Sequence, residues 1–443
     1  MKAGALALLG VACSASVEAP SPVTPTGGAP TPTIPSFRGA VPANLLLISI
    51  DTFRRDRAGA FAPGTMPFLE QLMNEGFTLE NHMTCANWTM MAMACSVNGR
   101  LNEENGFIPE HLDLRAPLPA GPTLASELHR PSLLVSGNFW FAEEWNTSQG
   151  FDSVVRLNGT AEQIVGLAMA APQAITGPEG GWFVHAHVME PHSPYNPPDE
   201  YLSAEAELDP IPWDLSNSEQ GYAAGDTWPD LAPDEQALLK AHFEVRYEAE
   251  LAWLDDQLER IWADLDARHL LDDTLVVLFD DHGEQLFDHG QESHAYALYG
   301  AENDGFVTFW SKNVEAGHWT GPTSQIDLAP TLLQLYGEAI PAEMTGIPLG
   351  EAPETRPVFA LTSARLGTIQ SVRQSGWKLV YPWRTGKLEL YDLVADPGET
   401  ENVFTRRDPL ARSLWGELLP HVLLAEPIVL DDIPTWPPGF PRR

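Results

Sequence analysis

Two short runs of apolar residues, far apart in the chain, have the length and composition of buried strands. Residues 44–50, NLLLISI, and residues 274–279, TLVVLF, are nearly continuous runs of Leu, Ile, Val and Phe. Such runs are typical of strands in a parallel sheet that is covered on both faces. The first run ends at Asp51 and the second at Asp280 and Asp281. We therefore expect two neighbouring strands that present carboxylates at one edge of a sheet, where open α/β sheets bind their ligands.

The rest of the chain mixes helical and extended patterns. Residues 357–393 alternate apolar and polar positions, with turn signals at Ser375–Gly376 and Thr385–Gly386, as antiparallel strands do. The other predicted elements are helices over 67–74, 233–269 and 326–335, and strands over 77–82 and 306–310. We predict an α/β fold with a mixed sheet flanked by helices and a smaller C-terminal antiparallel sheet. Residues 41–350 would form the larger domain and residues 351–443 a C-terminal subdomain and tail.

A stretch rich in Met and Ala, residues 89–98, predicts a helix with Thr89 at its start. Met and Ala are good helix formers, and Asn98–Gly99 supply a stop signal. Thr89 is placed as the N-cap residue. One interpretation is that it only caps the helix. The other is that its hydroxyl serves a site at the helix N-terminus, where the helix dipole and free N–H groups favour an anion.

The pair Asp281–His282 is the first candidate for chemistry. A carboxylate next to an imidazole, at the end of a buried strand, suits a divalent ion such as Zn²⁺ or Mn²⁺. His294 offers another imidazole twelve residues later. The alternative is a solvated turn with surface histidines.

The first forty residues have the pattern of a targeting segment and a tether. Residues 1–13 contain one Lys and a short apolar run, which predicts a secretory signal peptide. Small residues before Cys13 resemble a bacterial lipoprotein signal, in which Cys13 would carry the lipid, although Leu9 stands one place too early. Residues 14–40 are rich in Pro, Thr, Ser and Ala and predict a disordered tether. The alternative is a secreted protein with a disordered leader. Cys85 and Cys95 leave a single disulfide possible but undetermined.

The charge balance limits the partners. Sixty-one acidic and 25 basic residues give a formal net charge of −36, so a nucleic-acid partner is not expected. Between Arg156 and Lys240 the chain has neither Lys nor Arg, and acidic residues recur over 199–235. This segment would either line the entrance of a site, favouring a substrate that carries an amine, or form an ordinary solvated loop.

Several segments, in order along the chain, resemble the sulfatase branch of the alkaline phosphatase superfamily. They begin with NLLLISIDTFRRDRAGAF and MPFLEQLMNEGFTLENHMTCANWT and continue through TLASELHRPSLLVSGNFW, WFVHAHVMEPHSPY, YEAELAWLDDQLERIW, the Asp281–His282 strand, SQIDLAPTLLQLYG and GKLELYDLVADPGETEN. The resemblance covers about residues 43–405. It implies an alkaline-phosphatase-like fold, one divalent metal ion (Ca, Mn or Zn) and hydrolysis of sulfate or phosphate esters.

The resemblance also implies site residues. Metal ligands would be Asp51, Asp281 and His282, and Thr89 falls at the position of the nucleophile. His192 and His294 match positions that hold the oxygens of the substrate's sulfate or phosphate group. Weaker substrate-binding candidates are His187 and Asn138, the latter standing where the family has Lys. His185 and His289 are interpreted as packing or supporting residues.

The departures from the family pattern concern the nucleophile and the metal site. Sulfatases carry Cys or Ser at this position, followed by Pro and Arg, and oxidise it to formylglycine; here the sequence is Thr89-Met-Met-Ala-Met. At the position of the family's second metal-site Asp, this chain has Thr52. The set is similar to members that use a Thr nucleophile, including phosphodiesterases and phosphoethanolamine transferases, because a phospho-Thr intermediate can be hydrolysed by a second attack at phosphorus.

Three hypotheses follow for the function. The first is a Thr-nucleophile phosphoesterase or phosphotransferase that acts on a small-molecule, glycan or lipid-headgroup ester. The second is a true sulfatase, and the third is a non-catalytic extracellular binding protein on the same fold. The expected location is secreted or in the cell envelope, as a periplasmic or outer-surface lipoprotein, with membrane attachment only through Cys13.

Overall fold

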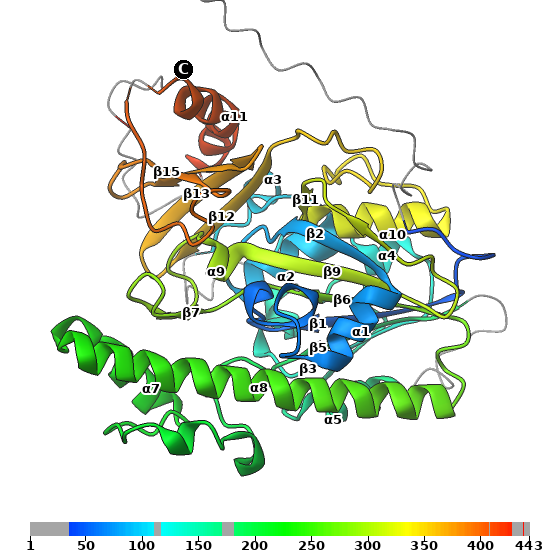
Figure 1. Ribbon diagram of the computed structural model, residues 1–443. Helices are drawn as coiled ribbons and strands as arrows, with labels where there is room; N and C mark the ends of the chain where they lie inside the picture. Colours follow the sequence, from blue (N-terminus) through cyan, green and yellow to red (C-terminus); the bar gives the residue numbers. More distant parts are fainter. Residues whose placement is uncertain (1–34, 110–116, 171–180, 407, 428–436, 438–443) are drawn as a thin grey trace, which may run out of the picture. The chain divides into compact units, whose positions relative to one another are not determined.

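A large mixed sheet runs through the part of the chain that the computed structural model describes, which is residues 35–109, 117–170, 181–406, 408–427 and 437. In these residues nine strands form the sheet, in the order β10-β2-β9-β6-β1-β5-β3-β4 with β11 beside β2 (Figure 1). Their bounds are β1 Asn44–Ile50, β2 Phe77–Met83, β3 Ser132–Ser136, β4 Ser153–Arg156, β5 Phe183–Val188, β6 Thr274–Asp280, β9 Asp304–Trp310, β10 Gly317–Trp319 and β11 Thr323–Ser324. The prediction of a mixed α/β sheet is confirmed.

The two apolar runs are neighbours at the centre of the sheet. β1 pairs in parallel with β6 on one side and with β5 on the other. The register aligns Ile50 with Asp280, so the residues that follow both strands emerge side by side. β9 is antiparallel to both β6 and β2, which makes the sheet mixed.

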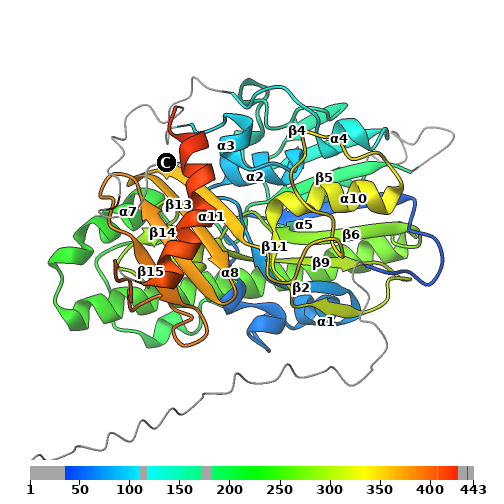
Figure 2. The same ribbon diagram turned by 90° about the horizontal axis from the view of Figure 1, so that it is seen from above.

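Helices cover both faces of the sheet. Leu46, Ile48 and Ile50 of β1 share a core with α1, α5 and α8, whereas Leu45 and Leu47 share a core with α2, α4 and α10. Figures 1 and 2 show α8 along one face and α10 over the other. The bounds are α1 Pro67–Glu75, α2 Thr89–Asn98, α3 Asn102–Asn105, α4 Leu124–Glu127, α5 Ala161–Ala168, α8 Pro233–Ala267, α9 Gly300–Asn303 and α10 Leu328–Tyr336. The helical spacing found in the sequence therefore predicted the two helices α1 and α8 to within two residues at each end.

A second, four-stranded antiparallel sheet follows, in the order β12-β13-β14-β15. Its strands are β12 Val358–Ala364, β13 Gly367–Gln374, β14 Trp377–Pro382 and β15 Glu389–Asp392, and α11 spans Pro409–Ala425. Ser375 and Gly376 both adopt positive φ angles in the turn between β13 and β14, as the turn signal predicted. One apolar core joins this sheet, α11 and α2, with Trp383 and Trp415 among its largest buried residues.

The acidic segment, residues 199–235, forms short helices between β5 and α8. They are η5 Asp199–Tyr201, η6 Glu205–Glu207, α7 Ser218–Thr227 and η7 Trp228–Asp230. Glu205 pairs with His242 and Arg246 of α8, so the segment is held on the surface of that helix. The remaining short elements are η1 Arg55–Arg57, η2 Gly59–Phe61, η3 Phe139–Phe141, η4 Glu143–Trp145, η8 Gln325–Asp327 and the hairpin of β7 Gln285–Leu286 and β8 Glu292–Ser293.

The predicted signal peptide, the lipidated Cys13 and most of the predicted tether lie outside the described residues, as does most of the chain after Glu426. Among the residues that are described, no helix combines the length and apolar character that a bilayer span requires.

The packing of α8 on the sheet gives a stability prediction. Leu254 is fully buried in the core that α8 shares with the sheet, whereas Leu424 on α11 is 44% exposed. Leu254→Ala should lower the free energy of unfolding by about 2–5 kcal/mol, because it removes buried methyl groups and leaves a cavity. Leu424→Ala makes the same change in a helix and should cost well under half of that. Urea unfolding monitored by circular dichroism measures both; equal losses would contradict the assignment of α8 as a core helix.

Candidate functional site

The ends of β1 and β6 bring two carboxylates together. Asp51 follows β1 and its backbone N–H donates to Val188 O at 3.1 Å, while the N–H of Asp281, after β6, donates to Ile50 O at 3.2 Å. These bonds continue the ladder for one residue beyond the strands. Both side chains are completely buried. The parallel register of β1 and β6 is therefore what places two acidic side chains next to each other.

His282 completes a cluster of three groups that can hold a metal ion. Its Nε2 lies 3.7 Å from Asp51 Oδ1 and 3.5 Å from Asp281 Oδ2, and the three candidate ligand atoms lie within 4.8 Å of one another. Neither of the two oxygens has a hydrogen-bond partner among the described residues. His282 Nδ1 donates to Gly283 O at 2.9 Å, so the neutral ring presents the lone pair of Nε2 to the cluster. The donors fit one divalent cation.

The electrostatics of the cluster agree with this fit. Burial and the neighbouring carboxylate of Asp51 raise the pKa of Asp281 well above its usual value. Burial also opposes ionisation of Asp51, but the neighbouring His192 and His187 outweigh it and hold the pKa of Asp51 below its usual value. Burial lowers the pKa of His282 to about 4, which keeps the ring neutral, as a metal ligand must be. A cation would relieve the repulsion between the two carboxylates.

Gly283 is required by a close approach behind His282. A Cβ atom at this position would lie 2.0 Å from the carbonyl oxygen of Ala301. The N–H of Gly283 donates to Glu302 O at 2.9 Å, which ties the loop to α9. The glycine of the Asp281-His282-Gly283 sequence thus lets the chain turn tightly while His282 stays in the cluster.

Helix α2 brings Thr89 to the same place. The expectation that Thr89 is the N-cap is wrong by one residue, because Trp88 has the extended backbone of a cap (φ −156°, ψ 150°) and its C=O accepts from Ala92 N–H at 3.1 Å. Thr89 is the first helical residue, so its hydroxyl is not used on its own helix. Gly99 ends the helix with φ +63°, as predicted. Cys85 and Cys95 form a disulfide that ties the segment before α2 to the helix.

The hydroxyl of Thr89 points at the carboxylate–imidazole cluster. Its Oγ1 lies 3.4 Å from Asp51 Oδ2 and 3.5 Å from His282 Nε2. Asn138, after β3, donates from Nδ2 to Asp51 Oδ2 at 2.8 Å and to Thr89 Oγ1 at 3.2 Å. The amide of Asn138 is oriented by its other end, because Oδ1 accepts from Trp140 N–H at the start of η3. Asn138 therefore bridges Asp51 and Thr89.

The other predicted histidines also converge. The ring centroid of His294 lies 4.5 Å from that of His282 and 5.2 Å from that of His192. His192 Nδ1 donates to Ser193 O at 2.5 Å, and His294 Nδ1 lies 3.0 Å from Glu284 Oε1. His187 is placed differently, because its Nε2 lies 3.2 Å from Asp51 Oδ2. All eight residues singled out in the sequence thus lie in one cluster, with His187 in contact with a carboxylate.

Two residues of this region were missed in the sequence, Ser49 and Glu284. Ser49 hydrogen bonds to both His185 and His187, and Glu284 is completely buried beside His294. A signal for Ser49 was present, since it is the only hydroxyl in the apolar run of residues 45–50. Glu284 has no such signal, because an acid in a turn is ordinarily solvated.

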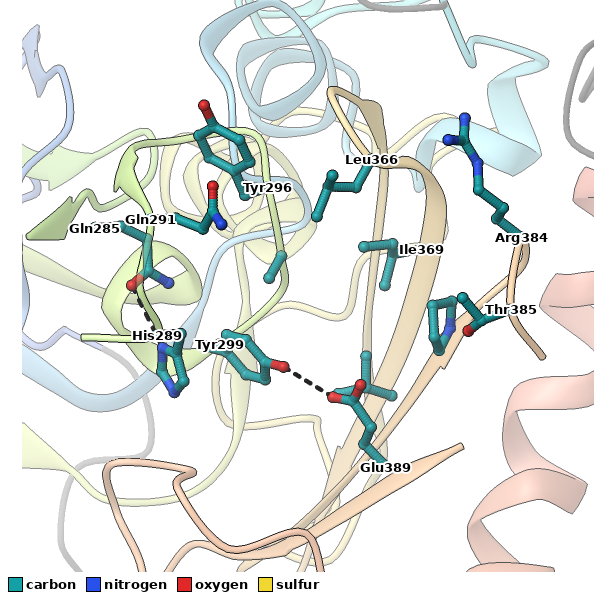
Figure 3. A pocket seen from close by; sticks show the side chains of 13 residues that line it. Gln285, His289, Gln291, Tyr296, Tyr299, Leu366, Ile369, Arg384, Thr385 and Glu389 are labelled. Carbon is teal, nitrogen blue, oxygen red and sulfur yellow. Dashed lines mark hydrogen bonds between the residues drawn. The ribbon is translucent and has the colours of Figure 1, made fainter. Parts of the chain in front are cut away.

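A cavity of about 360 Å³ lies between the segment after His282 and the C-terminal sheet (Figure 3). Tyr296 and Tyr299 line one wall, with His289 stacked on Tyr299 at a centroid distance of 3.9 Å. Leu366 and Ile369 of the C-terminal sheet line the opposite side, and Glu389 accepts a hydrogen bond from the Tyr299 hydroxyl at 3.0 Å. Tyr296 is two residues beyond His294, so the cavity wall and the histidine cluster belong to one short segment.

The arrangement defines a class of α/β protein. Two strand ends supply Asp51 and Asp281–His282 for one cation, and a helix beginning presents a hydroxyl to them, as sites for metal-assisted group transfer do. A comparison with family models agrees with this class: the model described as Sulfatase matches residues 43–338. The chain belongs to the sulfatase family, within the alkaline phosphatase superfamily, as the resemblance predicted. Members of this family generally bind a divalent metal ion.

Individual proteins similar to this chain are distant. Choline-sulfatase of Rhizobium meliloti (strain 1021) is 28% identical over 168 residues, which are 35% of this chain and 32% of that protein. The matches span between 18% and 51% of the curated relatives' own lengths. The solved structure of BT4656 with D-glucosamine-2-N,6-O-disulfate has a TM-score of 0.69 at 16% identity and covers 88% of this chain and 99% of that one. The phosphonate monoester hydrolase SpPMH from Silicibacter pomeroyi has a TM-score of 0.66 at 21% identity, covering 88% and 96%.

The metal cluster gives a prediction with a matched control. Asp280 and Asp281 are adjacent and both are buried, but only Asp281 belongs to the cluster; Asp280 Oδ1 accepts from Phe306 N–H at 2.7 Å. Mn²⁺, Zn²⁺ or Ca²⁺ at 100 times its Kd should stabilise the wild type by about 2.7 kcal/mol. Asp281→Asn should abolish this gain and Asp280→Asn should keep it. Melting temperatures with and without metal, after stripping with a chelator, measure the effect; equal behaviour of the two variants would refute the assignment of Asp281.

Proposed function

We propose that the protein is a metal-dependent hydrolase of phosphate esters in which Thr89 is the nucleophile. The observation that carries the proposal is the position of the Thr89 hydroxyl, 3.4 Å from Asp51 and 3.5 Å from His282. An activated hydroxyl beside a metal site is the usual arrangement for covalent group transfer. Transfer of the group to an acceptor alcohol, instead of water, would use the same site.

The choice of phosphate over sulfate rests on the side chain at the nucleophile position. Threonine cannot become formylglycine, and residues 90–93 contain neither the Pro nor the Arg of that motif. The two cysteines in the described part of the chain are joined in a disulfide, so neither supplies an alternative thiol. A phospho-Thr89 intermediate has a release route by attack of water at phosphorus. A sulfo-Thr89 ester would lack the elimination route that the hydrated aldehyde provides.

The proposed reaction assigns a task to each group. A cation held by Asp51, Asp281 and His282 would act as a Lewis acid that lowers the pKa of the nearby hydroxyl and polarises the ester. Thr89 Oγ attacks phosphorus in line, forming the Oγ–P bond while the bond from phosphorus to the leaving alcohol breaks. Asp51 Oδ2 is the nearest acceptor for the proton of Thr89, and Asn138 holds both groups in place.

The histidine pair completes the proposal. His192 and His294 bind the non-bridging oxygens, and one of the two gives its proton to the leaving alcohol. Their rings lie 5.2 Å apart, so one phosphoryl group can contact both. Water then attacks phosphorus in line and gives a proton to the histidine that protonated the alcohol. The bond from phosphorus to Thr89 Oγ1 breaks, and Thr89 takes back its proton from Asp51.

Sulfate ester hydrolysis is the second candidate, and the names of several curated relatives support it. Choline-sulfatase and N-acetylglucosamine-6-O-sulfatase are among the curated relatives. A phosphonate monoester hydrolase has the same fold, so the fold is compatible with attack at either sulfur or phosphorus.

The cavity shown in Figure 3 is where we place the alcohol part of the substrate. Its volume and its mixture of tyrosine, aliphatic and polar groups suit a small organic molecule or a sugar. Arg365, from the turn between β12 and β13, lies over the rings of Tyr296 and of Tyr222 on α7. The acidic segment thereby reaches the rim of the site, which would favour an uncharged or amine-bearing alcohol.

We also propose a secreted or cell-envelope location. The N-terminal pattern supports it, and so does the disulfide between Cys85 and Cys95, because disulfides persist in oxidising compartments.

Substitution of Thr89 tests the proposed function. Thr89→Ala should lower kcat on bis(4-nitrophenyl) phosphate by at least about 10³-fold, because removal of a nucleophile eliminates the covalent route. Thr89→Ser keeps a hydroxyl and should retain most of the activity. Wild-type turnover should be higher on this diester than on 4-nitrophenyl sulfate, with divalent metal present. The reverse preference would favour the sulfatase, and no turnover of either ester by metal-loaded protein would favour a binding protein.

Filling the cavity tests the placement of the alcohol. Leu366 is 50% exposed and lines the cavity. Leu366→Trp should lower kcat/KM about 10-fold or more for a phosphodiester with a sugar alcohol, because one steric contact is worth about 1–3 kcal/mol. The loss should be much smaller for the corresponding methyl ester. Leu424→Trp, at an exposed position of α11, should change neither. Equal losses on both esters with Leu366→Trp would contradict the placement.

A further inference from the structure

A hydrogen-bonded chain of three buried polar side chains, from strands β1 and β5, ends at Asp51. Ser49 of β1 and His187 of β5 are paired in the register of the two strands, and His185 lies two residues before His187 on the same face. All three side chains are completely buried. Ser49 Oγ lies 2.8 Å from His185 Nε2 and 2.8 Å from His187 Nδ1, and His187 Nε2 lies 3.2 Å from Asp51 Oδ2.

The position of each hydrogen in this chain follows from its two ends. At one end the carboxylate of Asp51 can only accept, so His187 Nε2 must donate. Nδ1, on the other side of the same ring, accepts the hydroxyl hydrogen of Ser49. Because that hydroxyl has one hydrogen, its oxygen accepts from His185 Nε2. Every hydrogen bond therefore runs in one direction, from His185 to Asp51.

The surroundings of His185 support this direction. Its ring lies among Phe141, Phe151 and Phe279, with centroid distances of 6.1, 6.3 and 6.1 Å, and its Nδ1 has no hydrogen-bond partner within the described residues. The reverse direction would leave an unpaired N–H at His185 Nδ1 among the phenylalanines. Burial lowers the pKa of His185 to about 3, so the neutral ring with the hydrogen on Nε2 is the favoured form.

Asp51 presents its two oxygens to different partners. Oδ2 receives hydrogen bonds from Asn138, His187 and Thr89, at 2.8, 3.2 and 3.4 Å. Oδ1 receives none and lies 3.7 Å from His282 Nε2. Of the donors to Oδ2, His187 is the one on a central strand, and its ring is held in place by Ser49. Turning the carboxylate about its Cβ–Cγ bond, away from this orientation, would stretch or break these bonds.

We propose that Ser49 is a positioning residue: through His187 it fixes the orientation of Asp51 so that Oδ1 faces the cation. The inference rests on the proposed metal site. Groups that hydrogen bond to metal ligands typically change metal affinity by about 10–100-fold when they are removed. Ser49 touches neither the cation position nor the substrate, so its effect is transmitted entirely by His187 and Asp51.

Metal titration of the full-length protein tests the proposal without using activity. After the metal is stripped with a chelator, Mn²⁺ or Zn²⁺ binding is measured by isothermal titration calorimetry. Ser49 acts on Asp51 only through His187, so Ser49→Ala should weaken binding by about 10-fold, the lower end of that range. Ser49→Cys keeps the shape and a weak donor, and should give an intermediate affinity even if the alanine variant does not fold.

A matched control separates this effect from a general loss of stability. Thr323 on β11 makes the same kind of contact, hydroxyl to buried imidazole, with His82 Nδ1 at 3.0 Å, but far along the sheet from Asp51. Thr323→Val should lower the melting temperature of the metal-free protein, as Ser49→Ala does, yet leave metal affinity unchanged. Wild-type affinity in both Ser49 variants would overturn the inference, and so would a wild-type protein that binds no divalent cation. Weakened binding by Ser49→Ala in a protein without ester turnover would uphold the inference and refute the proposed function.

Discussion

The adjacency of two buried carboxylates, Asp51 and Asp281, is the constraint on which the rest of this structure depends. Strand pairing between β1 and β6 forces the two side chains together in a region closed to water. Like charges at such a distance repel strongly where the effective dielectric constant is low. The imidazoles and the Asn138 amide that surround the two carboxylates offset part of that repulsion. A divalent cation would offset the rest.

Helix α2 is the second determinant of the site. It is buried along its whole length, because Met93 and Val97 pack in the core of the main sheet while Met90 and Met91 pack in the core shared with the C-terminal sheet. A helix covered all round has no polar face, which explains its run of Met and Ala. Because α2 packs in both cores, contacts from both sheets hold its first residue beside Asp51.

Much of the fold could be predicted from the sequence, because buried strands and helices place their apolar residues at characteristic spacings. Residues 44–50 coincide with β1, and the long helix and the C-terminal antiparallel strands were located within a few residues. Thr89 was misassigned as a cap because Ser and Thr are frequent at N-caps. Its hydroxyl instead hydrogen bonds to Asp51 and Asn138, which are distant in the sequence. Ser49 was missed although it is the only hydroxyl in its apolar run, and Glu284 was missed because an acid in a turn is ordinarily solvated. Their partners are set by strand order and by a long loop, and neither is encoded in the residues nearby.

The guanidinium of Arg365 connects the C-terminal sheet to the segment that carries His294 and Tyr296. It lies over Tyr296, and its Nη1 donates to the Tyr296 hydroxyl at 2.6 Å, from a turn that follows both strands carrying the acidic cluster. A ribosome must therefore synthesise more than 360 residues before this wall exists, and the second sheet that covers α2 is completed only at Asp392. A chain that ends before Arg365 therefore lacks both this contact to Tyr296 and the sheet that packs on α2.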